Sequence, residues 1–533
     1  MKVQAPYFPI VYVRGFAATR GEIEDTVATP YMGFNLGATK VRQDHRRDVV
    51  RLVFESPLLR LIKDHGYTDT YQQGDLIDES EEVSARSIWI FRYYEPVSTD
   101  LGSGERKTIP EFAVDLRRFI LRIRASVCGR DPVAREAFRV HLTAHSMGGL
   151  ICRAYLQNIC RRGAGDADVD EKLELPGDPL VDKVFTYATP HGGIDFGGRN
   201  VPDLGALDPV HVRNFNRVAM RSYLKIEPDG DVTSLDGAFP PKRFFSLIGT
   251  NYRDYTAFFG LSQKAAGEMS DGLVRIKNAA VRHSPRAFVH RAHSGHFGIV
   301  NSEEGYQNLR RFLFGEAAVR IRLATDEVTL PKEVEAQKKA GRNVEAAYLI
   351  ETSAKVRGAL CYLNQRRVDH SSAIHVDHRR LSGEGRPVLL FSGYLLEQAK
   401  MKQARDTALA FALSVSIQVP LFEVERRFWL DTHFEGATLF EETISFHLRR
   451  GRRGLSLHYG LASRHGAGVA PSRLAAISSD GEPRESSPAV DGEEREEGEI
   501  HHYELPVGFK AGLKRPPRPG FRGRLLVEIE MDR

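Results

Sequence analysis

Up to about residue 316, short apolar runs alternate with longer segments in which apolar residues recur at helical spacing. Apolar runs of four to eight residues are typical of buried strands, and spacings of three and four residues are typical of helices. The predicted strands are PIVYVRGF, SIWIFRYY, FRVHLTAH, VDKVFTYATP, RFFSLIGT and RAFVHR. Strands of this kind separated by helices predict a mostly parallel sheet covered by helices on both faces, an α/β fold.

The helix predicted between the second and third of these strands has a clear start signal. In TIPEFAVDLRRFILRIRASVCG, Thr108 and Glu111 stand three residues apart with Pro110 between them. A threonine followed three residues later by glutamate is the pattern of a capping box, in which each side chain binds the backbone N–H of the other residue. We therefore expect the helix to begin directly after Thr108.

Beyond residue 316 the pattern changes to strands that alternate apolar and polar residues, as in ALSVSIQV and GRLLVEIEM. Alternation with period two is typical of strands with one buried face, and turn-rich pieces join them. We predict a catalytic domain over residues 1–316 and a β-rich, sandwich-like accessory domain over residues 317–533. Residues 470–499 are rich in Ser, Pro, Gly and Glu, so a flexible loop is expected there.

Composition narrows the class of protein. The 533 residues are 41% hydrophobic and 27% charged, with a net charge of +5. This small charge gives no case for nucleic-acid binding. The chain starts without a signal-peptide layout, and the most apolar run, residues 407–422, is too short for a membrane span. Four cysteines without a CxxC pair fit a reducing compartment. We expect a cytoplasmic protein, or one exported without a conventional signal peptide.

The candidate chemistry starts at TAHSMGG, where an apolar strand meets a helix. A serine hydroxyl needs a base to take its proton and N–H donors to stabilise the oxyanion. One solution is the nucleophile elbow G-x-S-x-G, a tight strand-to-helix turn in which small residues flank the serine. Ser146 has Ala144 two positions before it and Gly148 two positions after it. The sequence therefore predicts that Ser146 is a nucleophile rather than an ordinary turn residue.

Three further segments match one family in order. YATPHGG resembles a segment that follows the next strand in many lipases, SDGLVRIKNA resembles the segment with the catalytic acid, and GHFGIVNSEEGYQNLRRFL resembles the segment with the base. Together with the elbow, they make residues 8–315 similar to the α/β-hydrolase superfamily, in its lipase and esterase branch. The remaining residues do not share this resemblance.

The resemblance implies a role for each matching residue. Ser146 would be the nucleophile, Asp271 the acid that orients the base, and His296 the general base, in the chain order that this fold uses. The oxyanion would be held by the backbone N–H groups of Met147 and Phe16. Many lipases have His-Gly before the second donor, whereas this chain has Arg-Gly, which leaves the role of that arginine open.

Other residues nearby could take two of these roles. Asp271 precedes a glycine and could simply belong to a turn, and Glu268 and Asp254 are the alternative acids. His290 and His293 lie close to the predicted base. His145, directly before the nucleophile, is expected only to pack.

Two insertions are candidate lids over the site, near residues 31–80 and 196–241, and packed helices are the alternative for both. In the accessory domain, a cluster of histidines and aspartates near residues 369–378 matches no standard set of metal ligands, so no metal is expected. The predicted chemistry also requires no cofactor.

We therefore expect a serine hydrolase that cleaves carboxylic esters of lipids through an acyl-enzyme. A phospholipase that acts on membrane lipids, including one delivered as an effector, is the alternative within this class. A non-catalytic lipid-binding protein on a hydrolase scaffold is the alternative from another class. The expected partners are a lipid or ester substrate and a membrane or lipid interface; the sequence leaves head group, acyl length and oligomeric state open.

Overall fold

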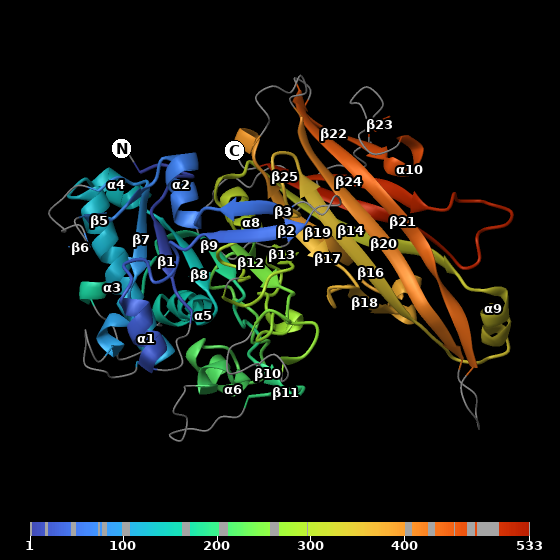
Figure 1. Ribbon diagram of the computed structural model, residues 1–533, viewed down its shortest axis with the longest axis horizontal. Helices are drawn as coiled ribbons and strands as arrows, with labels where there is room; N and C mark the ends of the chain where they lie inside the picture. Colours follow the sequence, from blue (N-terminus) through green and yellow to red (C-terminus); the bar gives the residue numbers. More distant parts are fainter. Residues whose placement is uncertain are drawn as a thin grey trace. The chain divides into compact units, whose positions relative to one another are not determined.

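The chain divides into two compact units (Figure 1). The computed structural model describes residues 3–15, 20–43, 49–72, 75–76, 83–98, 107–161, 171–201, 212–255, 266–295, 297–399, 408–424, 432–451, 454–465, 475–476 and 500–531. The first unit comprises Met1–Arg286 and His290–Phe314, and the second comprises Ala287–Val289 and Gly315–Arg533.

A seven-stranded sheet forms the core of the α/β region, in the order β13-β12-β9-β8-β1-β7-β4. The strands are β1 (Ile10–Val13), β4 (Thr68–Asp69), β7 (Ser87–Phe91), β8 (Val140–His145), β9 (Val181–Tyr187), β12 (Phe244–Gly249) and β13 (Arg286–Val289). The pairs β4–β7, β7–β1, β1–β8, β8–β9 and β9–β12 are parallel. Every residue of β1, β7 and β12 is buried, because helices cover both faces of a parallel sheet.

The strand order places a topological switch point between β1 and β8. After β1 the chain forms β4 and β7 on one side of it, and then returns to place β8 on the other side. In open parallel sheets, the loops that leave such a point from the carboxyl ends of the strands diverge and leave room for a ligand. The turn after β1 and the turn after β8 therefore meet at the expected position for a site.

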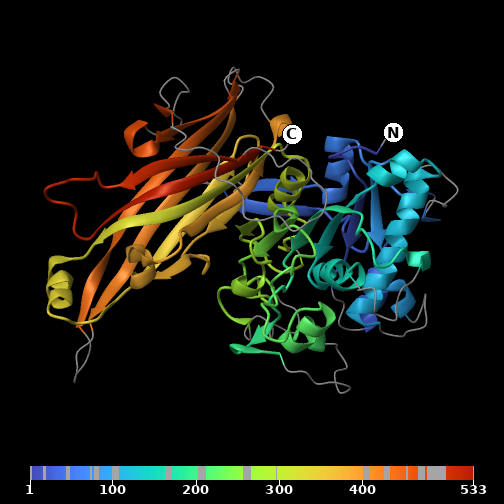
Figure 2. The same ribbon diagram turned by 180° about the vertical axis from the view of Figure 1, so that it is seen from behind.

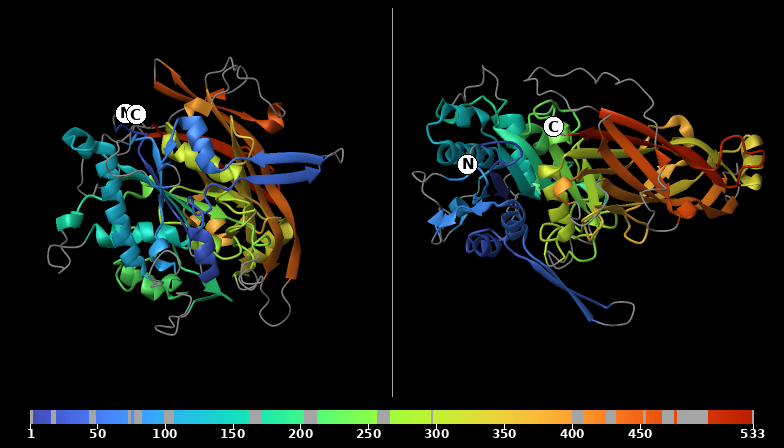
Figure 3. Two further views of the ribbon diagram at one scale, coloured as in Figure 1. Left: turned by 60° about the vertical axis from the view of Figure 1, so that its left-hand side comes forward. Right: turned by 90° about the horizontal axis from the view of Figure 1, so that it is seen from above.

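Helices pack on the sheet as the sequence pattern predicted. They are α1 (Arg20–Val27), α2 (Pro57–His65), α3 (Ile109–Cys128), α4 (Pro132–Ala137), α5 (Met147–Ala154), α6 (Arg217–Tyr223) and α8 (Glu303–Phe314). Helices α3 and α5 pack together on one face, and α2 and α8 pack together on the other (Figure 3). The capping box at the start of α3 is confirmed, since the Thr108 N–H donates to Glu111 at 2.6 Å and the Thr108 hydroxyl accepts from the Glu111 N–H.

Three two-stranded antiparallel pairs lie outside the main sheet in the described part of the first unit. They are β2 (Ala38–Gln43) with β3 (Val49–Phe54), β5 (Tyr71–Gln72) with β6 (Asp75–Leu76), and β10 (Asp195–Phe196) with β11 (Arg199–Asn200). The first hairpin falls within the first predicted lid insertion.

The second unit consists of two antiparallel sheets around one apolar core (Figure 2). One sheet has the order β19-β14-β25-β24, and the other has the order β17-β16-β20-β21-β22-β23, with β15 and β18 beside it. The strands are β14 (Ala317–Thr329), β15 (Val344–Glu345), β16 (Ala347–Val356), β17 (Asn364–Arg366), β18 (Ile374–Asp377), β19 (Val388–Leu395), β20 (Leu409–Val424), β21 (Thr432–Gly451), β22 (Gly454–Leu461), β23 (Ala475–Ala476), β24 (Ile500–Gly508) and β25 (Gly520–Met531). Helices α9 (Lys332–Lys339) and α10 (Ala462–His465) accompany them.

Alternation explains the packing of this unit. Buried and partly buried residues alternate over most of β20 and β25, so each strand presents one face to the common core. The predicted fold class, an α/β-hydrolase-type sheet followed by a β-rich, sandwich-like unit, is therefore confirmed. Apart from β23, the predicted loop over residues 470–499 lies outside the described residues.

The described helices include none with both the length and the apolar character that a transmembrane segment needs.

Candidate active site

Ser146 sits at a strained turn between β8 and α5. Its backbone has φ 51° and ψ −124°, a region in which a residue with a side chain is held at a cost of about 1–3 kcal/mol. Two bonds hold the turn in place: the Ser146 N–H donates to the Tyr187 carbonyl, and the Thr189 hydroxyl donates to the Ser146 carbonyl, both at 2.9 Å. The turn therefore has the geometry predicted from TAHSMGG, in which the serine side chain projects from the carboxyl edge of the sheet.

Two positions at the turn require glycine, because the backbone after β1 and the backbone around Ser146 approach each other closely. A Cβ on Gly148 would collide with the backbone carbonyl oxygens of Val13 and Arg14. A Cβ on Gly15 would lie 2.8 Å from the Ser146 Cβ. Both glycines therefore allow the turn after β1 and the nucleophile turn to touch. Ala144, two positions before the serine, lies within β8, and its methyl group is accommodated there with full burial.

A chain of hydrogen bonds links Ser146 to a histidine and an aspartate. The Ser146 Oγ lies 2.9 Å from His293 Nε2, and His293 Nδ1 lies 2.9 Å from Asp271 Oδ2. All three residues are at most 4% exposed. Because the carboxylate accepts only, the bond to Asp271 places the ring proton on Nδ1 and leaves Nε2 free to accept the serine proton.

Asp271 is fixed in the loop after β12 by its own backbone environment. Its Oδ1 accepts hydrogen bonds from the N–H groups of Leu273 at 3.0 Å and Val274 at 2.7 Å. Asp271 is therefore both a turn residue and the hydrogen-bond partner of the histidine, so these two interpretations are compatible. The alternative acids pair elsewhere: Glu268 accepts from the Tyr252 hydroxyl, and Asp254 accepts from the Asn251 amide.

The predicted base requires a correction. The resemblance to lipases implies His296 in this role, but His296 lies outside the described residues, and the structure places His293 between Ser146 and Asp271. The motif His-x-Gly could have indicated either residue, since His293-Ser294-Gly295 also fits it. His293 follows the end of β13 by four residues and His296 by seven, and the sequence pattern does not distinguish the two.

The structure describes only one of the two predicted oxyanion donors. Helix α5 begins at Met147, so its N–H is among the first N–H groups of the helix, which no helical carbonyl accepts. This N–H therefore fits the expected donor beside the nucleophile. Phe16 lies outside the described residues, so its donor role stays a prediction.

Parts of both lid candidates are anchored. In the first, α2 buries Leu58 and Leu61, and Arg60 forms an ion pair of 2.9 Å with Glu303 of α8. In the second, Asn216 caps α6, and Arg217 bonds to Asp195 at 2.7 Å. These helices are packed elements of the first unit, and movement of the remaining lid segments stays a prediction.

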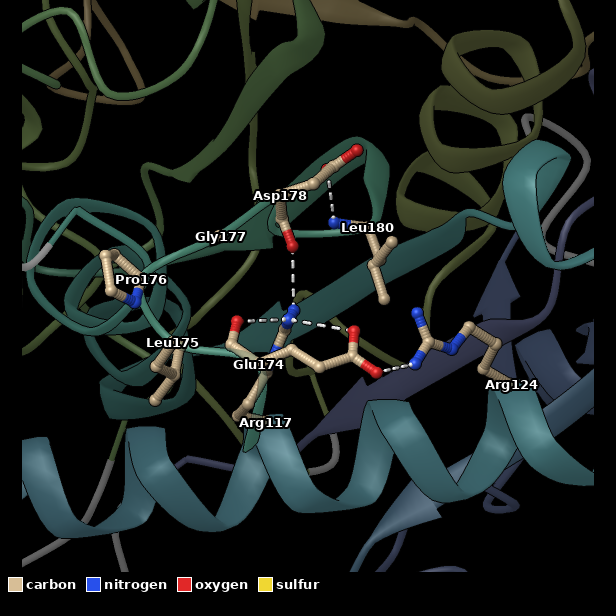
Figure 4. A pocket seen from close by; sticks show the side chains of 8 residues that line it. All are labelled: Arg117, Arg124, Glu174, Leu175, Pro176, Gly177, Asp178 and Leu180. Atoms are coloured by element: carbon tan, nitrogen blue, oxygen red, sulfur yellow. Dashed lines mark hydrogen bonds and ion pairs between the residues drawn. The ribbon is translucent and has the colours of Figure 1, made fainter. Parts of the chain in front are cut away.

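A pocket elsewhere in the first unit is lined by charged residues (Figure 4). Arg117 of α3 donates to the carbonyls of Leu173 and Asp178 at 2.9 and 2.7 Å, and Arg124 pairs with Glu174. These arginines fasten the segment that precedes β9. The pocket therefore lies at the amino ends of the strands, at the opposite edge of the sheet from Ser146, and we do not assign it to the substrate.

No group of His, Cys, Asp and Glu side chains in the described ranges could hold a metal ion. In the histidine-rich segment of the second unit, His378 Nδ1 instead lies 2.8 Å from the hydroxyl of Tyr348.

The fold and the site together define a class. A mostly parallel sheet carries a serine at a strained turn after β8, an aspartate after β12 and a histidine after β13, and the three are linked in the order serine, histidine, aspartate. This is the α/β-hydrolase arrangement, so the resemblance found in the sequence holds at the level of that superfamily.

No family model and no curated protein matches the chain. Among solved structures, a gene product of Listeria innocua is 12% identical with a TM-score of 0.25, covering 57% of this chain and 93% of that one. A protein described as a cell-surface hydrolase of Lactobacillus plantarum is 13% identical with a TM-score of 0.23, covering 58% and 92%. Phospholipase PlaB of Legionella pneumophila, in complex with thio-NAD, is 12% identical with a TM-score of 0.31, covering 80% and 89%.

Proposed function

We propose that this protein is a serine hydrolase that cleaves carboxylic esters of lipids. The observation that carries the proposal is the pair of 2.9 Å bonds that join Ser146, His293 and Asp271 at the strained turn. A hydroxyl beside an oriented imidazole is the standard arrangement for acyl transfer, and a scaffold used only for binding has no need to keep it.

In this mechanism, Ser146 Oγ attacks the ester carbonyl carbon while His293 Nε2 takes the hydroxyl proton. The carbonyl oxygen becomes an oxyanion, which in this proposal accepts a hydrogen bond from the Met147 N–H. The protonated ring then gives the proton to the leaving alkoxide, and the C–O bond breaks to leave an acyl-enzyme. A water molecule then attacks the acyl carbon while His293 takes its proton. The bond to Ser146 Oγ breaks, His293 returns the proton to this oxygen, and the carboxylic acid is released.

Asp271 has two tasks in this proposal. Its Oδ2 keeps the proton of the neutral ring on Nδ1, so that Nε2 can act as the base, and its charge stabilises the imidazolium that forms. The two backbone N–H groups on Oδ1 hold the carboxylate in the orientation that both tasks need.

Labelling with a fluorophosphonate tests the proposal. This probe reacts with an activated serine, so we expect the wild-type chain to be labelled and Ser146→Ala to be neither labelled nor active on a soluble p-nitrophenyl ester. Labelling of Ser146→Ala would remove Ser146 from the mechanism, and absence of labelling in the wild type would support the non-catalytic alternative.

The lipid part of the proposal rests on the resemblance of the sequence to lipases and needs its own assay. Release of fatty acid from triacylglycerol emulsions and from phospholipid vesicles, compared between wild type and Ser146→Ala, separates a lipase from a phospholipase. Hydrolysis of short soluble esters alone would reduce the proposal to an esterase.

A further inference from the structure

His145, the last residue of β8, lies between the nucleophile and the base. Its Nε2 is 2.9 Å from the backbone carbonyl oxygen of His293, and the two imidazole rings are 5.1 Å apart between centroids. Because a carbonyl only accepts, His145 Nε2 must carry the proton and donate. Burial, together with the nearby His293, lowers the pKa of His145 to about 3, so the ring stays neutral.

The other edge of the ring lies against the turn after β1. A Cβ on Gly15 would be 2.7 Å from His145 Nδ1, so only glycine leaves the space that the ring occupies. His145 thus packs between Gly15, in the turn that precedes the predicted oxyanion donor Phe16, and His293, in the loop after β13.

The backbone of His293 is held at both of its polar groups. Its N–H donates to the Asp271 carbonyl at 2.9 Å, and its carbonyl accepts from His145 at 2.9 Å. The first bond fixes the base to the acid. The second fixes it to the residue directly before the nucleophile, so one short hydrogen bond links the backbone of His293 to the turn at Ser146.

We propose that His145 is a positioning residue, whose Nε2–H holds the His293 backbone at the distance at which the His293 ring reaches the Ser146 hydroxyl. This inference rests on the proposed hydrolase function. A shift of the base by about 1 Å is expected to lower the rate of the chemical step by about 10- to 100-fold. Substrate binding should change little, because His145 acts through His293.

The structure offers a matched control on the same strand. His141 is fully buried, whereas His145 is partly buried. The Nε2 of His141 also bonds to a backbone carbonyl, that of Pro6, at 2.8 Å. Pro6 is not part of the site. Loss of the His141 bond should therefore affect stability in a similar way without affecting catalysis.

The experiment measures kcat and KM on a soluble p-nitrophenyl ester for the full-length chain, with competent sites counted by fluorophosphonate titration. Per titrated site, we expect His145→Leu to lose about 10- to 100-fold in kcat with KM nearly unchanged. His145→Gln, whose amide can donate from a similar position, should recover most of the rate, and His141→Leu should keep the wild-type kcat per site.

Wild-type kcat in His145→Leu, or a rate in His145→Gln as low as in His145→Leu, would overturn the inference. If His145→Leu does not fold, His145→Asn replaces it: its shorter amide cannot reach the carbonyl and should be slow, and a wild-type rate would be equally decisive. Activity in Ser146→Ala would refute the proposed function itself, whereas an inactive Ser146→Ala with a fully active His145→Leu would refute only this inference.

Discussion

The fixed orientation of Asp271 makes the substitution Asp271→Asn informative. In the wild type, Oδ1 accepts from two backbone N–H groups at 3.0 and 2.7 Å, and Oδ2 faces His293 Nδ1 at 2.9 Å. In the variant, the amide oxygen must take the Oδ1 position, because an NH₂ group there would face two donors. The NH₂ group then points at His293 Nδ1.

This geometry forces the wrong tautomer. His293 Nδ1 must accept from the amide, so the ring proton moves to Nε2, which can no longer take the proton of Ser146. Loss of the correct tautomer lowers kcat by about 10⁴-fold in a triad of this kind, which corresponds to about 5.5 kcal/mol in the activation free energy. The fold should be retained, since the amide keeps the shape of the carboxylate.

The assay is the kcat for hydrolysis of p-nitrophenyl butyrate near neutral pH, with the melting temperature as a check on folding. Asp254→Asn and Glu268→Gln are the matched controls, because these carboxylates bond to Asn251 and Tyr252 rather than to the base. A folded Asp271→Asn with activity within one order of magnitude of the wild type would refute the reasoning. So would an equal loss in Glu268→Gln.

Three further predictions concern the base, the turn and stability. His293→Gln should abolish ester hydrolysis and His296→Gln should retain it; the opposite result in the same kinetic assay would restore the assignment made from sequence. Gly148→Ala should lower the free energy of unfolding by about 1–3 kcal/mol, since its methyl group would meet the backbone carbonyls of Val13 and Arg14, whereas Ala144→Gly should stay active. Burial lowers the pKa of His141 to about 4, below the unfolded value of about 6.5. Between these two pH values the unfolded chain binds more protons than the folded chain, so the free energy of unfolding falls as the pH drops from about 6.5 to about 4. His141→Gln should reduce that fall by up to about 1.4 kcal/mol per pH unit, and urea unfolding at pH 6 and pH 5 would show whether the slope changes.

Local sequence patterns predicted most of the framework of the first unit. The strand runs, the capping box at Thr108 and the elbow at Ser146 each depend on residues that are neighbours in the chain, and each has the predicted form in the structure. The turn at Asp271 belongs to the same group, because Asp-Gly fixes its own backbone through short-range bonds.

The base could not be settled in this way. His293 and His296 are three positions apart, and each is followed two positions later by a glycine. The side chain that meets Ser146 is 147 positions away along the chain, so the choice depends on the course of the loop after β13. Local patterns carry no information about that course.

His145 shows the same division. From the sequence alone it is a histidine at the end of a strand, with packing as its expected role. Its hydrogen bond to the His293 carbonyl spans 148 positions and arises because β8 ends beside the loop that follows β13.

The sequence by itself determined most of the elements of the first unit and the position of the turn at Ser146, because propensity, capping and close-packed glycines act over a few residues. Only the tertiary structure decided which histidine completes the hydrogen-bonded chain and what holds that histidine in place. Those contacts depend on strand order and loop path, which many distant parts of the chain set together.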